Sequence, residues 1–396
     1  MGNQGKKSGY LQGNAGFRHL IHNRMVRIFI QIRRIHWTIP RLLFLVLVAA
    51  GCSKEPGSLP FEPFVWEIST PMAEGMDPIM LDSAFIMASD HGFVDGLMVV
   101  RNGKIVAEEY YNAYSVDRPH NIMSVSKSML SAITGQVLYG EYGLDLEDKM
   151  LDYFPQYAST SLDPRTQDIT IEHLLTMRMG IPGEAENDYA VYWELYSSDN
   201  WIKHTIEYPL VNDPGERMRY NTFITHLLSG VITQVTGQGT DEFAATHLFA
   251  PMGIDVDSWE KDPQGICFGG NSMHMTPREM AVFGLLYLQD GVLRGERILP
   301  LAWVEQSLSP STNNTHPNEW GSWKNYNYAR LWWLGQFAGY DSFMGYGYGG
   351  QFVIVFPDLD LIVVSMAPNN VNPDTSTIQE WAIFDLVTRY ILPSIS

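Results

Sequence analysis

Apolar residues follow a strand-like pattern near both ends of this 396-residue chain. Residues 97–110 contain two apolar runs on either side of Asn102-Gly103, a strong sequence signal for a two-residue β-hairpin. Residues 351–366 contain two more apolar runs on either side of Pro357-Asp358. These two segments predict hairpins, and together they predict one antiparallel sheet built from both ends of the chain.

Between and beside these hairpins the apolar positions recur at helical spacing. Thr276-Pro277-Arg278-Glu279 has a capping threonine, a proline in the first turn and a glutamate three residues after the cap, the signature of a helix start. Gly237 is placed to end a preceding helix. The expected helices cover about 78–89, a run starting at Ser124, 169–175, 221–235, a run starting at Thr276, and 377–391.

The expected fold class is therefore α/β, an α+β sandwich in which helices flank an antiparallel sheet and a mainly helical region is inserted. We expect a single domain over 76–392, with a sheet region at about 76–125 and 271–392 and a helical region at about 126–270. Residues 53–75 are rich in Pro, Gly and Ser and predict a tether.

The first 52 residues have the pattern of a targeting segment. Basic residues precede a short apolar run, 42–50, which is too short to span a bilayer and ends in Ala49-Ala50-Gly51-Cys52. Small residues before a single cysteine resemble a bacterial lipoprotein signal, in which Cys52 is lipidated. A plain signal peptide with an incidental cysteine is the alternative. The expected location is the bacterial cell envelope, lipid-anchored, or alternatively outside the cell.

Charge and cysteine content exclude several functions. The formal net charge is −18, and because residues 1–52 carry eight basic residues and no acid, the remainder carries −26. Such an acidic body is a poor partner for nucleic acid or for an anionic membrane surface. Cys52 and Cys267 are the chain's two cysteines, so a disulfide framework or a cysteine zinc site is not expected. We expect neither a metal nor a cofactor, and membrane contact only through the lipid anchor.

Ser124-Val125-Ser126-Lys127 is the candidate for catalysis. Residues three apart lie on one face of a helix, so this S-x-x-K tetrad places the Ser124 hydroxyl beside the Lys127 amine. A desolvated lysine can lose its proton and then accept the one on serine. A second tetrad, Ser258 to Lys261, lies in an acidic, proline-bounded stretch and is interpreted as a chance match in a loop. An ordinary helix-start serine remains the alternative for Ser124.

Two further elements complete the candidate site. Tyr220-Asn221-Thr222 stands ahead of an apolar helix, where a lysine and the helix dipole are expected to lower the phenol pKa and let Tyr220 relay protons. Gly345 to Gln351 is glycine-rich and leads into a strand, so its backbone can approach a substrate closely. A backbone N–H there and that of Ser124 can form an oxyanion hole. A packed tyrosine and a simple glycine turn are the alternatives.

Taken together, these motifs resemble the serine β-lactamase and penicillin-binding-protein-like superfamily, over roughly residues 75–392. Its class C β-lactamases, family VIII carboxylesterases, D-amino-peptide hydrolases and 6-aminohexanoate-dimer-hydrolase-like proteins are the most similar groups. Residues 169–177, Pro214-Gly215 before Tyr220, and 350–357 also match the family's pattern. The resemblance implies a β-lactamase/transpeptidase-like fold, with a site between the sheet and the helical region.

Two departures from the family pattern affect the expected substrate. The usual Tyr-x-Asn has Thr222 in place of asparagine, and the third motif lacks its lysine or histidine, with Gly345-Tyr346-Gly347 as the best placement. The missing basic residue argues against a β-lactam carboxylate. The resemblance therefore implies a metal-free serine hydrolase that cleaves a small ester or amide through an acyl-enzyme on Ser124. Alternatives are β-lactamase or D-amino-peptidase activity, or a non-catalytic envelope binding protein.

The remaining candidates bind the oxyanion or the substrate. Tyr348 is expected to supply the second oxyanion N–H from beside Gly347, and Thr222 to bind substrate. Four aromatic residues are candidates for an acyl pocket, with ordinary core packing as the alternative for each: Tyr189, Trp193, Trp332 and Trp333. Oligomeric state and substrate identity do not follow from the sequence.

Overall fold

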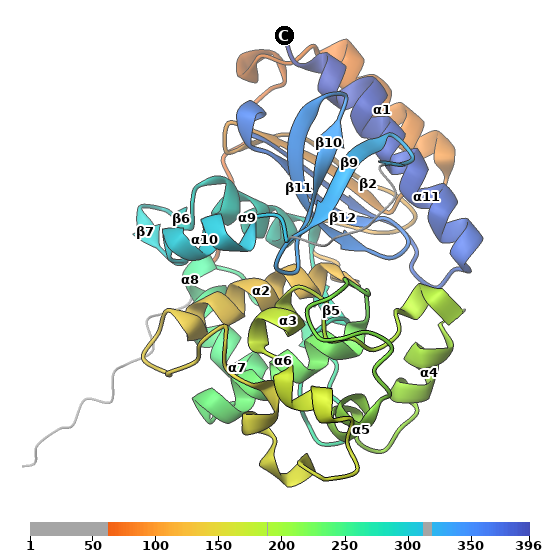
Figure 1. Ribbon diagram of the computed structural model, residues 1–396. Coiled ribbons are helices and arrows are strands. Elements are labelled where there is room, and N and C mark those ends of the chain that lie inside the picture. Colours follow the sequence, from red (N-terminus) through yellow and green to blue (C-terminus); the bar gives the residue numbers. More distant parts are fainter. Residues whose placement is uncertain (1–61, 188, 312–318) are drawn as a thin grey trace, which may run out of the picture. The chain divides into compact units, whose positions relative to one another are not determined.

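The structure is a computed structural model that describes residues 62–187, 189–311 and 319–396. Within these residues the central feature is an eight-stranded antiparallel sheet in the order β2-β1-β13-β12-β11-β10-β9-β8 (Figure 1). Its strands are β1 Gly96–Arg101, β2 Lys104–Tyr110, β8 Glu319–Trp320, β9 Trp323–Tyr328, β10 Trp333–Phe337, β11 Tyr340–Gly347, β12 Gln351–Phe356 and β13 Leu361–Met366.

Strands from the N-terminal and C-terminal parts of the described chain pair inside this sheet, next to its β2 edge strand. Strand β1 pairs with β13 in a register that sets Gly96 opposite Met366 and Arg101 opposite Leu361. Both expected hairpins are present, as β1–β2 and β12–β13. The prediction of one antiparallel sheet built from both ends of the chain is therefore confirmed.

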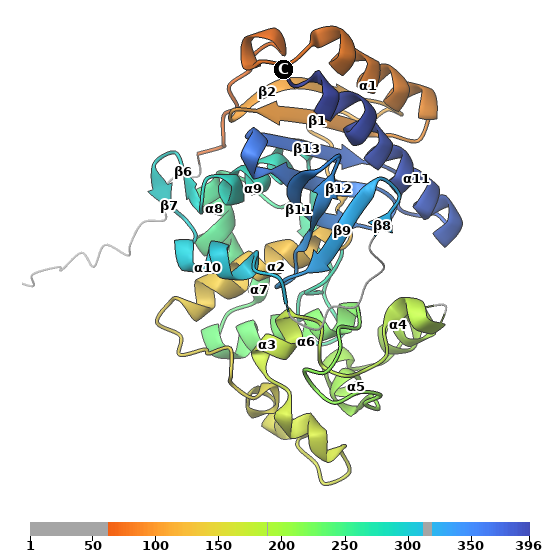
Figure 2. The same ribbon diagram turned by 45° about the horizontal axis from the view of Figure 1, so that its top comes forward.

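Helices cover both faces of the sheet. Alternate residues of β12 point to opposite sides, with Val353 in one apolar cluster and Ile354 in the other. Helices α1 Pro78–His91 and α11 Pro373–Leu386 pack on the Ile354 side and lie side by side in Figures 1 and 2. Helices α2 Val125–Leu138 and α9 Pro277–Leu288 pack on the other side. Because both faces are covered, β12 and β13 are apolar at nearly every position.

The inserted region is mainly helical and lies against α2 on the side away from the sheet (Figure 2). Helix α2 is thus the central helix of the fold, with 12 of its 14 residues buried. The other helices are α3 Ile171–Leu175, α4 Ala190–Tyr196, α5 Trp201–Glu207, α6 Thr222–Thr236, α7 Thr240–Ala244, α8 Ala250–Met252 and α10 Leu301–Ser307. Short strands β3 His120–Asn121, β4 Ser258–Trp259 and β5 Met273–Met275 form a second small sheet, and β6 Val292–Leu293 pairs with β7 Glu296–Arg297.

The structure differs from the sequence expectations in two places. Residues 62–75, expected as part of a tether, lie on the domain: Trp66 is buried, and Ser69 N donates to Ile105 O at 2.9 Å. The physical reason is that the Trp66 side chain packs into the same apolar cluster as Ile105 of β2. Strands β8 to β11 were also not expected, because their sequences mix glycine, aromatic and polar residues without a clean alternation.

The described residues belong to one compact unit. None of their helices combines the length and the apolar character that crossing a membrane requires. Among the same residues, no three His, Cys, Asp or Glu side chains gather in a way that could hold a metal ion.

Candidate active site

Ser124 lies at the start of α2, next to a strained backbone position. Met123 has a φ of 50°, in the left-handed region, and its N–H donates to Asn121 Oδ1 at 2.9 Å. Ser124 is the N-cap of α2, yet its side chain caps no backbone N–H of the helix. A helix-start serine normally uses its hydroxyl for that purpose. The Ser124 hydroxyl is instead directed to Lys127, which argues against an ordinary capping serine.

Lys127 is buried in a site lined by three acceptors. Its side chain is 1% exposed, and Nζ donates to Ser124 Oγ at 2.8 Å, to Thr222 Oγ1 at 3.0 Å and to the Gly270 carbonyl at 2.7 Å. Three acceptors match the three hydrogens of an ammonium group. The helical i to i+3 spacing thus delivers the serine–lysine contact that the sequence predicts.

Two opposing effects set the pKa of Lys127. Burial lowers the pKa of Lys127 to about 7, and the nearby Glu184 carboxylate acts in the opposite direction. A group with a pKa near neutrality can both accept and release a proton at physiological pH. Lys127 therefore has the properties of a general base.

Tyr220 adjoins this pair, as expected, but its phenol differs from expectation. The Lys127 Nζ lies 4.9 Å from the centre of the Tyr220 ring, and a hydrogen bond with the Ser124 side chain lowers the pKa of Tyr220. Burial outweighs that effect and raises the pKa well above its usual value. The expected lowering of the Tyr220 pKa is therefore wrong, because desolvation disfavours the phenolate. The Tyr220 phenol is therefore neutral at neutral pH.

Thr222 takes part in the site together with a residue that the sequence analysis missed. Its hydroxyl accepts from Lys127, and its backbone N–H donates to the carboxylate of the buried Glu184. The Glu184 N–H in turn donates to the Tyr220 carbonyl at 2.9 Å. Glu184 begins a short 3₁₀ helix, Glu184–Asn187, 36 residues before Tyr220, and no motif or spacing in the sequence singles it out.

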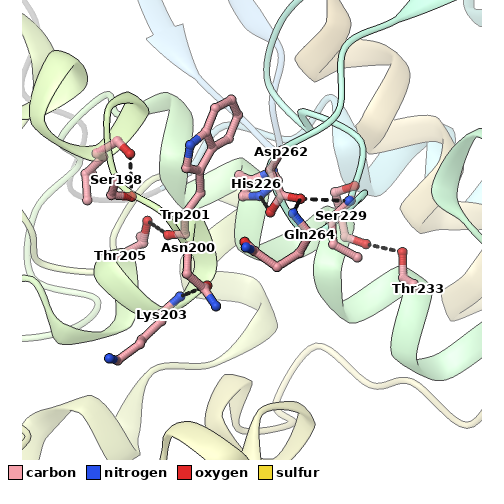
Figure 3. Close-up of polar contacts among 12 residues, drawn as sticks. Ser198, Asn200, Trp201, Lys203, Thr205, His226, Ser229, Thr233, Asp262 and Gln264 are labelled. Atoms are coloured by element: carbon pink, nitrogen blue, oxygen red, sulfur yellow. Dashed lines mark hydrogen bonds and ion pairs between the residues drawn. The ribbon is translucent and has the colours of Figure 1, made fainter.

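The Gly270 carbonyl is brought to Lys127 by a loop that packs on α6. A Cβ at Gly270 would lie 2.2 Å from Thr225 Oγ1 and 3.1 Å from Lys127 Nζ, so a larger residue cannot approach as closely. The start of this loop is fixed by a fully buried pair, His226 of α6 and Asp262, whose Nε2 and Oδ2 atoms are 3.0 Å apart (Figure 3). Asp262 also accepts the backbone N–H of Gln264 at 2.8 Å.

The glycine-rich segment forms the end of β11 and the turn into β12, beside the start of α2. A Cβ at Gly347 would lie 2.5 Å from the carbonyl oxygen of Ile122, and one at Gly345 would meet Val125 at 3.0 Å. The backbone of this strand therefore passes close to the helix start that carries Ser124. The Tyr348 hydroxyl donates to the Val371 carbonyl at 2.9 Å, and the use of the Tyr348 N–H in an oxyanion hole stays a prediction.

The four candidate pocket aromatics lie in different environments. Trp333 stacks on Tyr220, with ring centroids 5.8 Å apart. Tyr189 is half-buried and faces Glu184. Trp193 is 60% exposed on α4, so it does not line an enclosed pocket. Trp332 is fully buried among Phe283 and other aromatic residues, which makes it a core residue and corrects its assignment to the pocket.

The remaining sequence candidates lie apart from this site or outside the described residues. The second S-x-x-K tetrad begins in the short strand β4 and not in a loop as expected, because Ser258 and Trp259 pair with β5. Ser258 is exposed and Lys261 forms an ion pair with Asp241 at 2.7 Å, which supports the interpretation as a chance match. Cys267 is a buried free cysteine. Cys52, the expected lipidation site, lies outside the described residues.

The chain matches a known protein family. The model of the Beta-lactamase family matches residues 87–388, and this chain belongs to that family. The expected membership of the serine β-lactamase and penicillin-binding-protein-like superfamily is therefore confirmed.

Among curated proteins, the 6-aminohexanoate-dimer hydrolase of Paenarthrobacter ureafaciens is 26% identical over 298 residues, which cover 71% of this chain and 74% of that protein. Two solved structures show the same fold. The octameric penicillin-binding protein homologue from Pyrococcus abyssi has a TM-score of 0.60 and 18% identity, covering 81% of this chain and 79% of its own. EstCE1, a hydrolase with promiscuous acyltransferase activity, has a TM-score of 0.64 and 16% identity, covering 80% and 100%.

Proposed function

We propose that this protein is a serine hydrolase that cleaves a small ester or amide through an acyl-enzyme on Ser124. Ser124 Oγ attacks the carbonyl carbon while its proton passes to Lys127 Nζ. The bond to the leaving group then breaks, and the leaving group departs with the proton relayed from Lys127 through Tyr220. Water attacks the ester on Ser124 in the second half, releases the acid and returns a proton to Ser124 Oγ.

The observation that carries this proposal is the 2.8 Å contact of a buried lysine with the Ser124 hydroxyl. Burial gives Lys127 a pKa of about 7, so a useful fraction of the amine is neutral and can accept a proton. The neutral phenol of Tyr220 can donate a hydrogen bond to the departing atom. A backbone N–H of Ser124 and that of Tyr348 are the proposed oxyanion donors, and Trp333 and Thr222 border the space for the acyl group.

Ester and amide substrates are preferred over β-lactams because the third motif carries no lysine or histidine. In this chain Gly345 stands where the family has its basic residue, so no cation from that position meets a substrate carboxylate. The name of the Paenarthrobacter relative describes hydrolysis of an aminohexanoate dimer, which supports an amide substrate. β-Lactamase and D-amino-peptidase activities remain the alternatives within the same chemistry.

A non-catalytic envelope protein is the alternative from another class. This alternative predicts that Ser124 no longer contacts Lys127, or that Lys127 is no longer buried. The Ser124 hydroxyl that caps no helix N–H, together with the full burial of Lys127, favours catalysis. In the proposed setting the protein meets small molecules, not nucleic acid, and touches the envelope membrane only through a lipid on Cys52.

The deciding experiment treats the full chain with a fluorophosphonate and measures intact mass. The expected result is one adduct on the wild type that is absent from Ser124→Ala. Ser258→Ala is the matched control, since it removes the serine of the other S-x-x-K tetrad and should leave the adduct intact. An unmodified wild-type protein with normal circular dichroism would contradict the proposal and favour the binding protein.

A further inference from the structure

The direct contacts of Lys127 do not neutralise the charge that it acquires when it is protonated. Accepting the proton of Ser124 creates an ammonium ion inside the protein, where an uncompensated charge is costly. The acceptors around Nζ are the oxygens of Ser124, Thr222 and Gly270, and all three are formally neutral. A formal negative charge is needed nearby if the protonated lysine is to be stable.

Glu184 supplies that negative charge. It does not contact Lys127 directly, because Thr222 lies between the two side chains. The Lys127 Nζ donates to Thr222 Oγ1, and the Thr222 hydroxyl interacts with the Glu184 side chain in a way that favours the ionised carboxylate. The Thr222 backbone N–H donates to the same carboxylate, so Thr222 holds Glu184 through both its side chain and its backbone. The result is a continuous chain, Ser124–Lys127–Thr222–Glu184, whose links come from α2, from the start of α6 and from the segment before α4.

Resting on the proposed function, we propose that Glu184 is a positioning residue whose carboxylate, acting through the Thr222 hydroxyl, stabilises the ammonium that Lys127 becomes when it takes the Ser124 proton. The arrangement parallels the acid of a Ser-His-Asp triad, which orients the base and stabilises its protonated form without taking the proton. Here lysine replaces the imidazole, and a threonine hydroxyl stands between base and acid. Thr222, which replaces the family's asparagine, therefore has a role of its own.

Electrostatic effects on both groups agree with this geometry. Desolvation lowers the pKa of Lys127, and Glu184 partly restores it. Burial raises the pKa of Glu184, whereas Lys127 and the two hydrogen bonds from Thr222 favour its ionised form. Among the side chains that the structure describes, four phenols also interact with this carboxylate, and burial raises their pKa values so that they stay neutral at neutral pH: Tyr189, Tyr192, Tyr220 and Tyr328.

The test is the pH dependence of fluorophosphonate labelling, which needs no knowledge of the natural substrate. In this reaction Ser124 Oγ forms a bond to phosphorus, fluoride leaves, and the Ser124 proton passes to Lys127. The second-order labelling rate of the full chain, measured by intact mass from pH 5 to 9, should rise along an acid limb that reports deprotonation of Lys127. In Glu184→Gln that limb should move to lower pH by about one unit, because removal of the negative charge lowers the lysine pKa. The plateau rate should fall about tenfold, because a weaker base accepts the proton less readily.

Three variants separate this role from a structural one. Glu184→Asp keeps the charge, so its limb should stay nearer to that of the wild type. Thr222→Val removes the bridging hydroxyl and should slow labelling, and Thr222→Ser should restore it. Glu380→Gln is the matched control. Glu380 is also buried and accepts from the Gly349 backbone N–H and from the Ser376 and Tyr346 hydroxyls, but Lys127 is not among its contacts. Its limb should not move.

The possible outcomes distinguish the two proposals. A lower plateau in Glu184→Gln with an unmoved limb would show that Glu184 only shapes the Tyr220–Thr222 turn, and the inference would be wrong while the serine hydrolase stands. An equal shift in Glu380→Gln, or wild-type labelling rates in Thr222→Val, would overturn it as well. Absence of labelling in the wild type at every pH would overturn both. If Glu184→Gln does not fold, the Asp, Val and Ser variants still decide.

Discussion

Trp333 stacks on Tyr220, with ring centroids 5.8 Å apart and ring planes inclined by 27°. Trp333 begins β10 of the sheet, and Tyr220 immediately precedes the Asn221 cap of α6 in the helical region. The contact therefore joins the two layers of the fold at the phenol that lies beside Ser124 and Lys127. It gives Trp333 a role in addition to the acyl-pocket lining expected from the sequence.

Replacing Trp333 should disturb the orientation of Tyr220. An aromatic pair of this kind contributes about 0.5–1.5 kcal/mol, so loss of the stack in Trp333→Ala should reduce turnover of an activated ester by up to about tenfold. Trp333→Phe keeps a ring at the position and should retain most of the rate. Equal rates for wild type and Trp333→Ala, measured with a p-nitrophenyl ester, would show that the stack does not orient the phenol.

Removing only the Tyr220 hydroxyl should affect substrates unequally. In Tyr220→Phe the ring can still stack on Trp333, but no phenol protonates the leaving group. An amine needs that proton more than p-nitrophenolate does, so hydrolysis of an anilide should fall by about 10²-fold or more, and of the p-nitrophenyl ester by clearly less. The comparison is made on matched acyl groups. A parallel loss on both substrates would assign Tyr220 another role.

Lys127 should make the stability of the protein depend on pH. Its pKa is about 7 in the folded protein and near 10.5 in an unfolded chain. Between these values the unfolded chain binds more protons, so the contribution of Lys127 to the free energy of unfolding rises from pH 7 to pH 10.5 and is constant below pH 7. Urea unfolding at pH 7.0 and 9.5 should show a rise, on the order of a few kcal/mol at most, that is largely absent in Lys127→Met. The same slope in both proteins would contradict the lowered pKa.

Gly270 should tolerate no side chain. Because its Cβ would lie 2.2 Å from Thr225 Oγ1, Gly270→Ala must push the loop away from α6 and move the carbonyl that accepts from Lys127. We expect a loss of about 1–3 kcal/mol in unfolding free energy together with slower fluorophosphonate labelling. Gly265→Ala in the same loop is the control. Its Cβ meets open space at a φ of 84°, so it should cost some stability and leave labelling unchanged.

Anchoring by Cys52 predicts a chemical modification. When the full chain is expressed in a bacterium and supplied with an alkyne-tagged fatty acid, the protein should become labelled and should partition with membranes. Cys52→Ala should abolish labelling and release the protein, whereas Cys267→Ala should keep the label because Cys267 is buried in the domain. Unlabelled wild-type protein would leave a plain signal peptide as the explanation of the leader.

The sequence predicts best those features that are set by neighbouring residues. The hairpin at Asn102-Gly103 depends on a local turn, the Thr276 capping box lies within four residues, and the Ser124–Lys127 contact follows from helix geometry. These features were all predicted. Strands β8 to β11 are not predicted, because their sequences show no regular alternation of apolar and polar residues. They form strands through pairing with neighbouring strands.

The sequence is less informative about groups whose properties depend on long-range burial. Tyr220 lies at a helix start beside a lysine, which predicts a lowered pKa, but the surrounding core reverses the sign. Glu184 is one acidic residue among 44 in the chain, and only the folded structure shows that it is buried against Thr222. Trp332 and Trp333 are adjacent in sequence, and only their burial separates a core residue from one beside the site.

The pairing of β1 with β13 also has a consequence for the order of folding. These strands are 260 or more residues apart along the chain, so a large loop must close before the β1–β2 hairpin can join the rest of the sheet. During synthesis the β1–β2 hairpin lacks its inner neighbour until residues 361–366 have been made. We therefore expect the sheet to close late and folding to be slow, as for other chains dominated by distant contacts. If residues 1–52 act as the export signal that the sequence predicts, late closure would keep the chain unfolded long enough to cross a membrane.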